Sequence, residues 1–327
     1  MGSELLQIPA IPEGLREAAL RGNLIPFIGA GASMLAECPG WDEFADAALS
    51  WLIDQGKLSH SHVEQIRHLN ARVKLSLARA IATDNKTPID YYHLLHRSPP
   101  RQVPKGCRLY NGLFALGNIF VTTNYDVWLD DQLPAGPTTA PIPEPKSLPP
   151  TPMHIVYRPE EILPSLLTQS NTVIHLHGSV NDPTTMIQTT SDYVRHYAAY
   201  ERSSRDPQTE NRVLTFLDFL FQHRTVLFIG YGLEELEILE YVLAKRQPTK
   251  GEAKHYLLAG FFSYQEALRR SLATYYQSEC GIELIPFRRD EKNWDQLLDV
   301  IEAWAKHMPA TTPLVLQEMR DMEDLLL

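Results

Sequence analysis

Residues 25–33 read Ile25-Pro26-Phe27-Ile28-Gly29-Ala30-Gly31-Ala32-Ser33, an apolar run that ends in a glycine turn. The apolar residues are typical of a buried strand, and the glycines leave room for backbone N–H groups to approach a ligand. Ser33 then opens a helix with a hydroxyl at its positive end. The stretch predicts a strand, turn and helix that cradle a diphosphate, and a tight packing turn is the alternative.

Three further polar segments follow apolar runs along the chain. They are Thr122-Thr123-Asn124-Tyr125-Asp126, His175-Leu176-His177-Gly178 and Phe228-Ile229-Gly230-Tyr231-Gly232. The carboxyl ends of parallel strands meet at one edge of an open α/β sheet, where such sheets bind their ligands. Four polar segments at strand ends therefore predict one shared crevice.

Apolar runs alternate with helical patterns over most of the chain. The candidate strands are Leu24–Ile28, Asn118–Thr122, Thr172–His177, Thr225–Gly230, His255–Ala259 and Ile282–Pro286. The candidate helices are Pro12–Arg21, Trp41–Ile53, His60–Ala82, Ser191–Tyr200, Asn211–Gln222, Leu233–Ala244, Tyr264–Ser278 and Trp294–His307. This alternation predicts an α/β fold with a Rossmann-like, doubly wound parallel sheet of about six strands.

The uneven spacing of these elements predicts one domain with insertions over residues 1–327. We expect a core of residues 12–40, 113–133, 170–181 and 223–310, and a smaller helical module from insertions 41–112 and 182–222. Eight prolines in 134–152 predict a stiff loop, which either covers the crevice, docks a partner or is a plain surface linker. An apolar helix at 311–327 either forms an association surface or packs on the sheet.

Composition narrows the class of protein. The net charge of -10, with no Lys/Arg-rich run, argues against direct nucleic-acid binding. Cys38, Cys107 and Cys280 are isolated in sequence, which argues against a zinc ribbon and a disulfide framework. No apolar run approaches the ~18 residues that span a bilayer. We therefore expect a cytoplasmic protein that does not contact membranes.

The first glycine turn lacks parts of the dinucleotide fingerprint of dehydrogenases. Met34 stands where a third glycine would lie, and no acidic residue ends a second strand about 20 residues on. An ordinary Rossmann dehydrogenase is therefore disfavoured.

The segment around Asn124 carries several groups suited to a ribose. Thr123 adds a hydroxyl, and Asn124 can donate and accept at once, which suits holding a ribose hydroxyl or positioning a water. Asp126 either receives a ribose hydroxyl or forms an Asx-turn with the amides of its own loop, at the start of a helix over Val127–Asp130.

His175 and His177 alternate along one strand and face the same way, with Gly178 allowing a close approach beyond them. His177 lies nearer the strand end and can take a proton from a ribose hydroxyl or from water. A buried core histidine is the alternative, above all for His175, and a His-x-His metal pair is a further one.

The second glycine turn, Gly230-Tyr231-Gly232, predicts a contact with the adenosine half of a dinucleotide. Tyr231 offers a stacking surface there. A plain connection between strand and helix is the alternative.

Taken in order, these four segments resemble the sirtuin fold, and within it the sirtuin-like NAD hydrolases of bacterial antiphage defence. The resemblance extends over nearly the whole chain. It implies that Gly29, Ala30, Gly31 and Ser33 hold the NAD+ diphosphate, that Asn124 and Asp126 act at the nicotinamide ribose, and that His177 is the base.

Two departures from the protein-deacylating sirtuins change the expected reaction. The four zinc cysteines are absent, and Cys38-Pro39-Gly40-Trp41-Asp42-Glu43-Phe44 stands where those enzymes carry an Ile-Pro-Asp-Phe-Arg-like segment. The resemblance then implies an NAD+ glycohydrolase (NAD+ nucleosidase) that uses water as acceptor, NAD+ as substrate and no metal.

Because uncontrolled NAD+ loss would kill the host cell, we expect activity gated by self-assembly, a partner protein of the same defence system, or both. The alternatives are a non-catalytic sensor of NAD+ or ADP-ribose, and an NAD-dependent deacylase.

Overall fold

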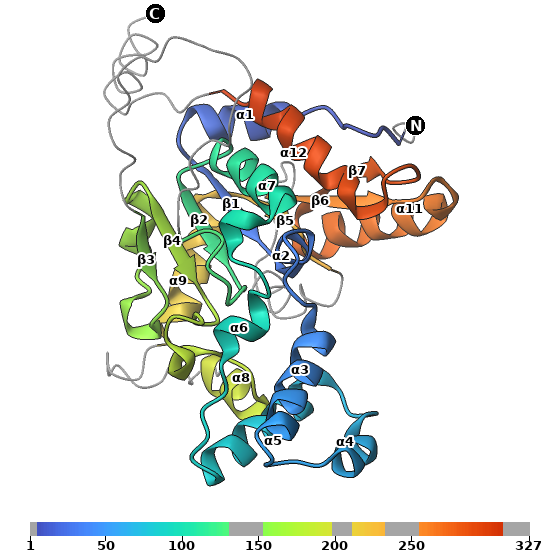
Figure 1. The fold of residues 1–327 in the computed structure, drawn as a ribbon. Helices are drawn as coiled ribbons and strands as arrows, with labels where there is room; N and C mark the ends of the chain where they lie inside the picture. The colour runs from blue at the N-terminus through green and yellow to red at the C-terminus, as the bar shows by residue number, and fades with distance from the viewer. Residues whose placement is uncertain (1–4, 131–152, 198–210, 233–254, 310–327) are drawn as a thin grey trace, which may run out of the picture.

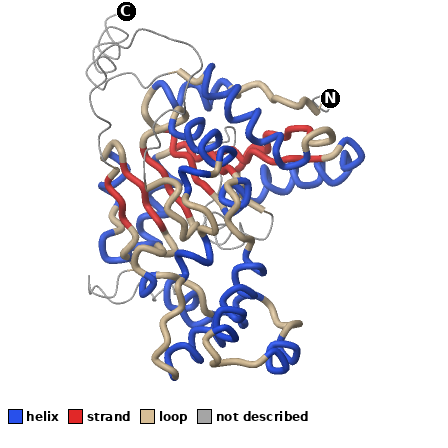
Figure 2. The backbone as a smooth tube through the Cα atoms, viewed as in Figure 1, coloured by secondary structure: helices blue, strands red, loops and turns tan. Residues whose placement is uncertain are grey.

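A computed structural model describes residues 5–130, 153–197, 211–232 and 255–309 of the chain (Figure 1). Seven parallel strands form one sheet in the order β3-β4-β2-β1-β5-β6-β7, and they run side by side in Figure 2. The strands are β1 (Leu24–Ile28), β2 (Ile119–Thr122), β3 (His154–Val156), β4 (Thr172–His175), β5 (Thr225–Ile229), β6 (His255–Phe261) and β7 (Ile282–Arg288). The predicted α/β fold with a doubly wound parallel sheet is confirmed.

The seventh strand, β3, has no counterpart among the six expected from the sequence. It is three residues long, lies at the sheet edge and pairs with β4, with His154 opposite Thr172. His154 is exposed, so the strand lacks the continuous apolar run that marks a buried strand. A strand this short carries too little pattern to be recognised.

Helices connect the strands. They are α1 (Glu13–Leu20), α2 (Ala30–Leu35), α3 (Trp41–Asp54), α4 (His60–Ile66), α5 (Ala71–Asp84), α6 (Tyr91–Leu95), α7 (Pro104–Phe114), α8 (Thr190–Tyr197), α9 (Arg212–His223), α11 (Glu266–Tyr275) and α12 (Gln296–His307). None of these helices has both the length and the apolar character needed to cross a membrane. The expected helix Leu233–Ala244, the proline-rich segment and the segment 311–327 lie outside the described residues.

The region expected to form one helix from His60 to Ala82 forms two, α4 and α5. Ser59 caps α4, accepting a hydrogen bond from the backbone N–H of His62, and Asn70 caps α5 in the same way from Val73. A side chain that satisfies free amides at a helix start stabilises that start by about 1 kcal/mol. The second cap accordingly interrupts the apolar periodicity.

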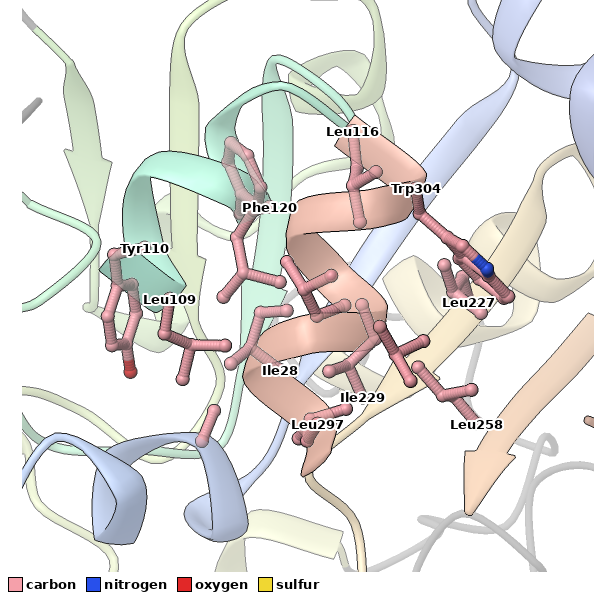
Figure 3. Packing of buried hydrophobic residues seen from close by; sticks show 14 of the residues in the cluster. Ile28, Leu109, Tyr110, Leu116, Phe120, Leu227, Ile229, Leu258, Leu297 and Trp304 are labelled. Carbon is pink, nitrogen blue, oxygen red and sulfur yellow. The ribbon is translucent and has the colours of Figure 1, made fainter. Parts of the chain in front are cut away.

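One face of the sheet packs against α1, α7 and α12. Figure 3 shows Leu297 and Trp304 of α12 beside side chains of β5 and β6 such as Leu227 and Leu258. The indole of Trp304 also donates a hydrogen bond to the carbonyl of Pro9 at 2.8 Å. This contact ties the segment before α1 to the last described helix.

The opposite face packs against α9, the turn at Pro164–Thr168 and the end of α11. Phe216, Leu220 and Phe221 of α9 are buried there against strand residues that include Phe228. Both faces of the sheet are therefore covered, as all-parallel sheets require.

A third apolar cluster forms a helical module beside the carboxyl edge of the sheet, at the lower end of Figure 1. Its core comes from α3, α5 and α6, and it includes Tyr125 from the loop after β2 and Val180 and Met186 from the loop after β4. The module therefore packs on the loops that carry the predicted site. Most of α7 lies within segment 41–112 and most of α9 within segment 182–222, and both helices pack against the sheet.

Candidate functional site

The strand order brings the four polar segments together. Strands β4, β2, β1 and β5 are consecutive neighbours, and the four segments follow their carboxyl ends. The chain leaves β1 toward β2 on one side and leaves β5 toward β6 on the other. Open α/β sheets bind ligands at such a reversal of direction, here between β1 and β5.

Asn124 lies at the centre of a buried polar network between the ends of β1 and β2. Its side-chain amide donates hydrogen bonds to the carbonyl of Gly29 at 3.0 Å and to Oγ of Ser33 at 2.7 Å. The Ser33 hydroxyl donates to Oδ2 of Asp126 at 2.5 Å, and the hydroxyl of Tyr110 lies 3.3 Å from the same Oγ. Four of the residues expected at the site, Gly29, Ser33, Asn124 and Asp126, thus lie in one network.

The directions of these hydrogen bonds follow from the groups involved. The carbonyl oxygen of Gly29 can only accept, so the amide nitrogen of Asn124 faces it. Both amide hydrogens of Asn124 are then used, because the second reaches Ser33. Within the described part of the chain no hydrogen bond engages Oδ1 of Asn124. This oxygen is the acceptor that the network offers to a ligand hydroxyl or a water.

Asp126 acts within the protein. One carboxylate oxygen accepts the Ser33 hydroxyl and the other accepts the backbone N–H of Trp128 at 3.1 Å. The second contact is the Asx-turn that the sequence left as an alternative, although residues 127–130 form turns and not a helix. The carboxylate therefore orients Ser33, and through it Asn124.

The two glycine turns contact each other. The backbone N–H of Gly31 donates to the carbonyl of Gly230 at 2.7 Å, and a Cβ on Gly31 would lie 2.8 Å from that oxygen. Gly230 has φ +73°, and a Cβ there would lie 2.5 Å from the amide of Ala32. Both positions require glycine because of this packing. The amides of Gly29 and Gly31 are used by the protein, and in the described residues no hydrogen bond uses the amide of Ala30.

Tyr231 connects the second glycine turn to the segment after β2. Its hydroxyl lies 3.0 Å from Oγ1 of Thr123, and its ring packs edge-on against Phe27 and Phe228. The side chain is only 9% exposed. In this arrangement Tyr231 joins the ends of β2 and β5 more than it offers an open stacking face. At Gly232, which follows it, no atom of the described residues lies within 4 Å of the position that a Cβ would take.

His175 is a core histidine, as the sequence left open. It is fully buried, with Nδ1 2.9 Å from the carbonyl of Asn124 and Nε2 2.7 Å from Oδ1 of Asp130. Burial alone would lower the pKa of His175, but the charge and hydrogen bond of Asp130 and the Asn124 carbonyl raise it. Both ring nitrogens face acceptors, so the imidazolium form donates to each. His175 therefore holds the backbone at Asn124.

His177 lies in a separate cluster formed with α8. Its Nε2 is 2.6 Å from the hydroxyl of Tyr197, and its ring packs edge-on against Tyr193 and His196. Burial, and then the charges of His196 and Arg72, lower the pKa of His177 to about 3. The imidazole is neutral at physiological pH and has its proton-accepting form available. No hydrogen bond in the described residues joins His177 to Asn124.

Because the histidines of this cluster are buried in their neutral form, we expect the folded protein to lose stability as the pH falls. Burial lowers the pKa of His196 to about 4, although a hydrogen bond to the Leu176 backbone and the charge of Asp192 act to raise it. Below about pH 6.5, His177 and His196 become protonated in the unfolded chain but stay neutral in the folded protein. Each therefore costs up to about 1.4 kcal/mol of stability for every unit that the pH falls toward 4. The melting temperature should fall between pH 7 and 5.

His196→Asn tests this expectation, because an asparagine can keep a hydrogen bond to the Leu176 carbonyl without the titrating ring. The drop in melting temperature between pH 7 and 5 should shrink in this variant. His62→Asn, a change at an exposed position of α4, is the control. Equal pH dependence in His196→Asn and the parent protein would contradict the assignment.

A cavity of about 710 Å³ begins at the glycine turns and continues along the carboxyl ends of β5, β6 and β7. Its lining includes Gly31, Gly230 and Gly232 at one end and Trp294 at the other. Most of the lining is apolar. Asn124 and His177 are not among its described lining residues, whereas Gly31 and Gly230 are.

Sequence reasoning missed several residues of the site: Arg72, Tyr110, Asp130, His196 and Tyr197. Four of them lie on the helices α5, α7 and α8, and Asp130 lies in the loop after β2; each is distant in the chain from the residue on which it acts. No local pattern marks such residues, because only the tertiary fold brings them to the site.

Metal ligation receives no support from the described ranges, where no three His, Cys, Asp or Glu side chains gather closely enough to hold an ion. His175 and His177 make separate contacts, to Asp130 and Tyr197.

Comparison with known proteins identifies a family. A model of the SIR2-like domain matches residues 118–285, slightly more than half of the chain, and this range includes Asn124, His177 and Gly230. The first glycine turn lies before it. A search of curated proteins found no match. The chain therefore belongs to the SIR2-like domain family, which connects it to NAD-related chemistry.

Proposed function

We propose that the protein is an NAD+ glycohydrolase, which cleaves NAD+ to nicotinamide and ADP-ribose. The observation that carries the proposal is the oriented amide of Asn124. Its two hydrogens are held by Gly29 and Ser33, so its oxygen is left as a fixed acceptor at the edge of the sheet. Such an oxygen can hold a ribose hydroxyl or a water without reorganising during the reaction.

The arrangement of the site supports a dinucleotide that crosses the two glycine turns. The diphosphate would lie over Gly29–Ser33, where the amide of Ala30 makes no hydrogen bond to any other described residue. The nicotinamide ribose would lie toward Asn124, and the adenosine half toward the cavity that begins at Gly31. Ser33, Thr123, Asp126 and Tyr231 would then act by holding the loops that contact the substrate.

The reaction makes few demands on the protein. The bond between C1′ of the ribose and the pyridinium nitrogen breaks, its electron pair stays on nitrogen, and nicotinamide leaves as a neutral molecule. A water then attacks C1′ of the oxocarbenium-like ribose. The attached water is far more acidic than an imidazolium, so even a base of low pKa such as His177 can accept its proton.

The biological role we propose is that of the NAD+-depleting effector of an antiphage system. The resemblance of the ordered segments to sirtuin-like hydrolases of such systems supports it, as does the absence of the deacylase residues. Activity would be gated by assembly or by a partner protein.

Product analysis tests the proposal directly. Purified protein is incubated with NAD+, with and without proteins encoded beside it, and the products are separated by chromatography. We expect nicotinamide and ADP-ribose in equal amounts, and a loss of both in His177→Ala. Calorimetric binding without nicotinamide release under any condition would favour the sensor instead. Release that requires an acylated peptide would favour a deacylase.

A further inference from the structure

The cavity beside the glycine turns contains one charged side chain among its described lining residues, Arg289, which follows β7. The same lining includes no aspartate or glutamate. The cavity also includes Gly31 and Gly230, so it is continuous with the turns at which the proposed function puts the diphosphate. A ligand that extends from those turns into the cavity reaches the arginine.

Aromatic residues hold the guanidinium of Arg289 in a defined plane. Its central carbon lies 4.1 Å from the ring centre of Phe262 and 3.9 Å from that of Trp294, and Nη1 donates to Oδ1 of Asn293 at 2.9 Å. The ring of Tyr264 stacks on that of Phe262, with 5.3 Å between ring centres. A planar group held in this way is pre-organised to bind an anion through two nitrogens.

Among the described residues, Arg289 has no carboxylate as a counter-ion. In the described part of the chain no carboxylate lies within ion-pair distance of its guanidinium, and its Nε is buried without a hydrogen-bond partner. Burial also lowers the pKa of Arg289. A partly desolvated cation without an anionic partner is costly, and a bound anion would offset that cost.

Dinucleotide sites reveal their substrate by the group that faces the adenosine ribose. A carboxylate accepts the 2′-hydroxyl of NAD+, whereas an arginine accommodates the 2′-phosphate of NADP+. The described cavity residues include an arginine, Arg289, and no carboxylate. We propose that Arg289 binds the 2′-phosphate of NADP+, and that the site accepts NADP+ at least as well as NAD+. This inference rests on the proposed function.

Binding of product fragments tests the inference without any reaction. Calorimetry on the full chain compares ADP-ribose with 2′-phospho-ADP-ribose. We expect the phosphorylated fragment to bind about tenfold tighter or better, as a charge-assisted pair of hydrogen bonds implies. In Arg289→Gln this preference should disappear, while ADP-ribose binds within about threefold of the parent protein. Melting temperatures check that the variant is folded.

Arg288→Gln is the matched control. It removes the same charge from the neighbouring residue, whose side chain pairs with Glu291 outside the cavity, and the preference should persist. Arg289→Lys keeps the positive charge and should retain part of the preference for 2′-phospho-ADP-ribose.

Three outcomes would overturn the inference: equal affinity of the parent for both fragments, a preference that survives in Arg289→Gln, or no binding of either fragment. The proposed function is judged separately by nicotinamide release from NAD+. Release of nicotinamide together with equal affinities for the two fragments would contradict the inference about NADP+ but leave the proposed function standing.

Discussion

Asn124→Ala is expected to lower the rate of NAD+ hydrolysis by about 10²- to 10³-fold, the loss typical when one oriented polar group is removed from a reaction centre. The alanine removes Oδ1, which is the acceptor proposed for the ribose hydroxyl or water. It also leaves the carbonyl of Gly29 without its side-chain donor. The measurement is kcat for nicotinamide release, with the melting temperature of each variant recorded beside it.

Asn118→Ala provides the control for this variant. Asn118 immediately precedes the same strand, β2, but lies at its opposite end, and its amide donates a long hydrogen bond of 3.3 Å to Ser170. The same change there should leave kcat unchanged. A folded Asn124→Ala protein with parental turnover would remove Asn124 from the reaction, and with it the central support for the proposed function.

Gly178→Ala is expected to destabilise the fold by about 3–5 kcal/mol, close to the largest effects of single substitutions. Gly178 has φ +83°, which alone costs an alanine about 1–2 kcal/mol. The added Cβ would also lie 2.2 Å from the carbonyl oxygen of Thr185, a contact that only a shift of the backbone can relieve. Thermal unfolding should show a melting temperature about 4–7 °C lower.

Gly56→Ala separates the two contributions to this loss. Gly56 has a similar φ of +66°, but nothing lies within 4 Å of the position of its Cβ. The variant should lose only about 1 kcal/mol, from the backbone conformation. Similar losses in the two variants would show that the close approach at Gly178 contributes little.

The sheet could be predicted from the sequence because its central strands are uniformly apolar. Every residue of β1, from Leu24 to Ile28, is buried, and such a run has few interpretations beside turn residues such as Gly29 and Gly31. The adjacency of the four polar segments followed from the same reasoning. β3 was not predicted because only one of its three residues, Val156, is buried and the strand lies at the sheet edge.

The side-chain partners within the site could not be predicted in the same way. Ser33 contacts Tyr110 across 77 residues of chain, and Asn124 lies 91 residues from Ser33. Residue types suggested that Asn124 has a role, but the direction in which its amide oxygen points depends on Gly29 and Ser33. For His177 the sequence suggested an ordinary imidazole, whereas burial beside His196 and Arg72 makes it a much weaker base. Such effects arise only when distant elements pack.

The core of the helical module includes a residue next to the proposed reaction site. Tyr125, the residue after Asn124, is buried in the module's core, and its hydroxyl donates to the carbonyl of Ile187 while its own carbonyl accepts the N–H of Val180. The loops after β2 and β4 are thereby fastened to each other and to α3. A partner protein that binds the module could therefore shift the position of Asn124, and deletion of the module would remove the packing around Tyr125, Val180 and Met186 that helps to hold both loops.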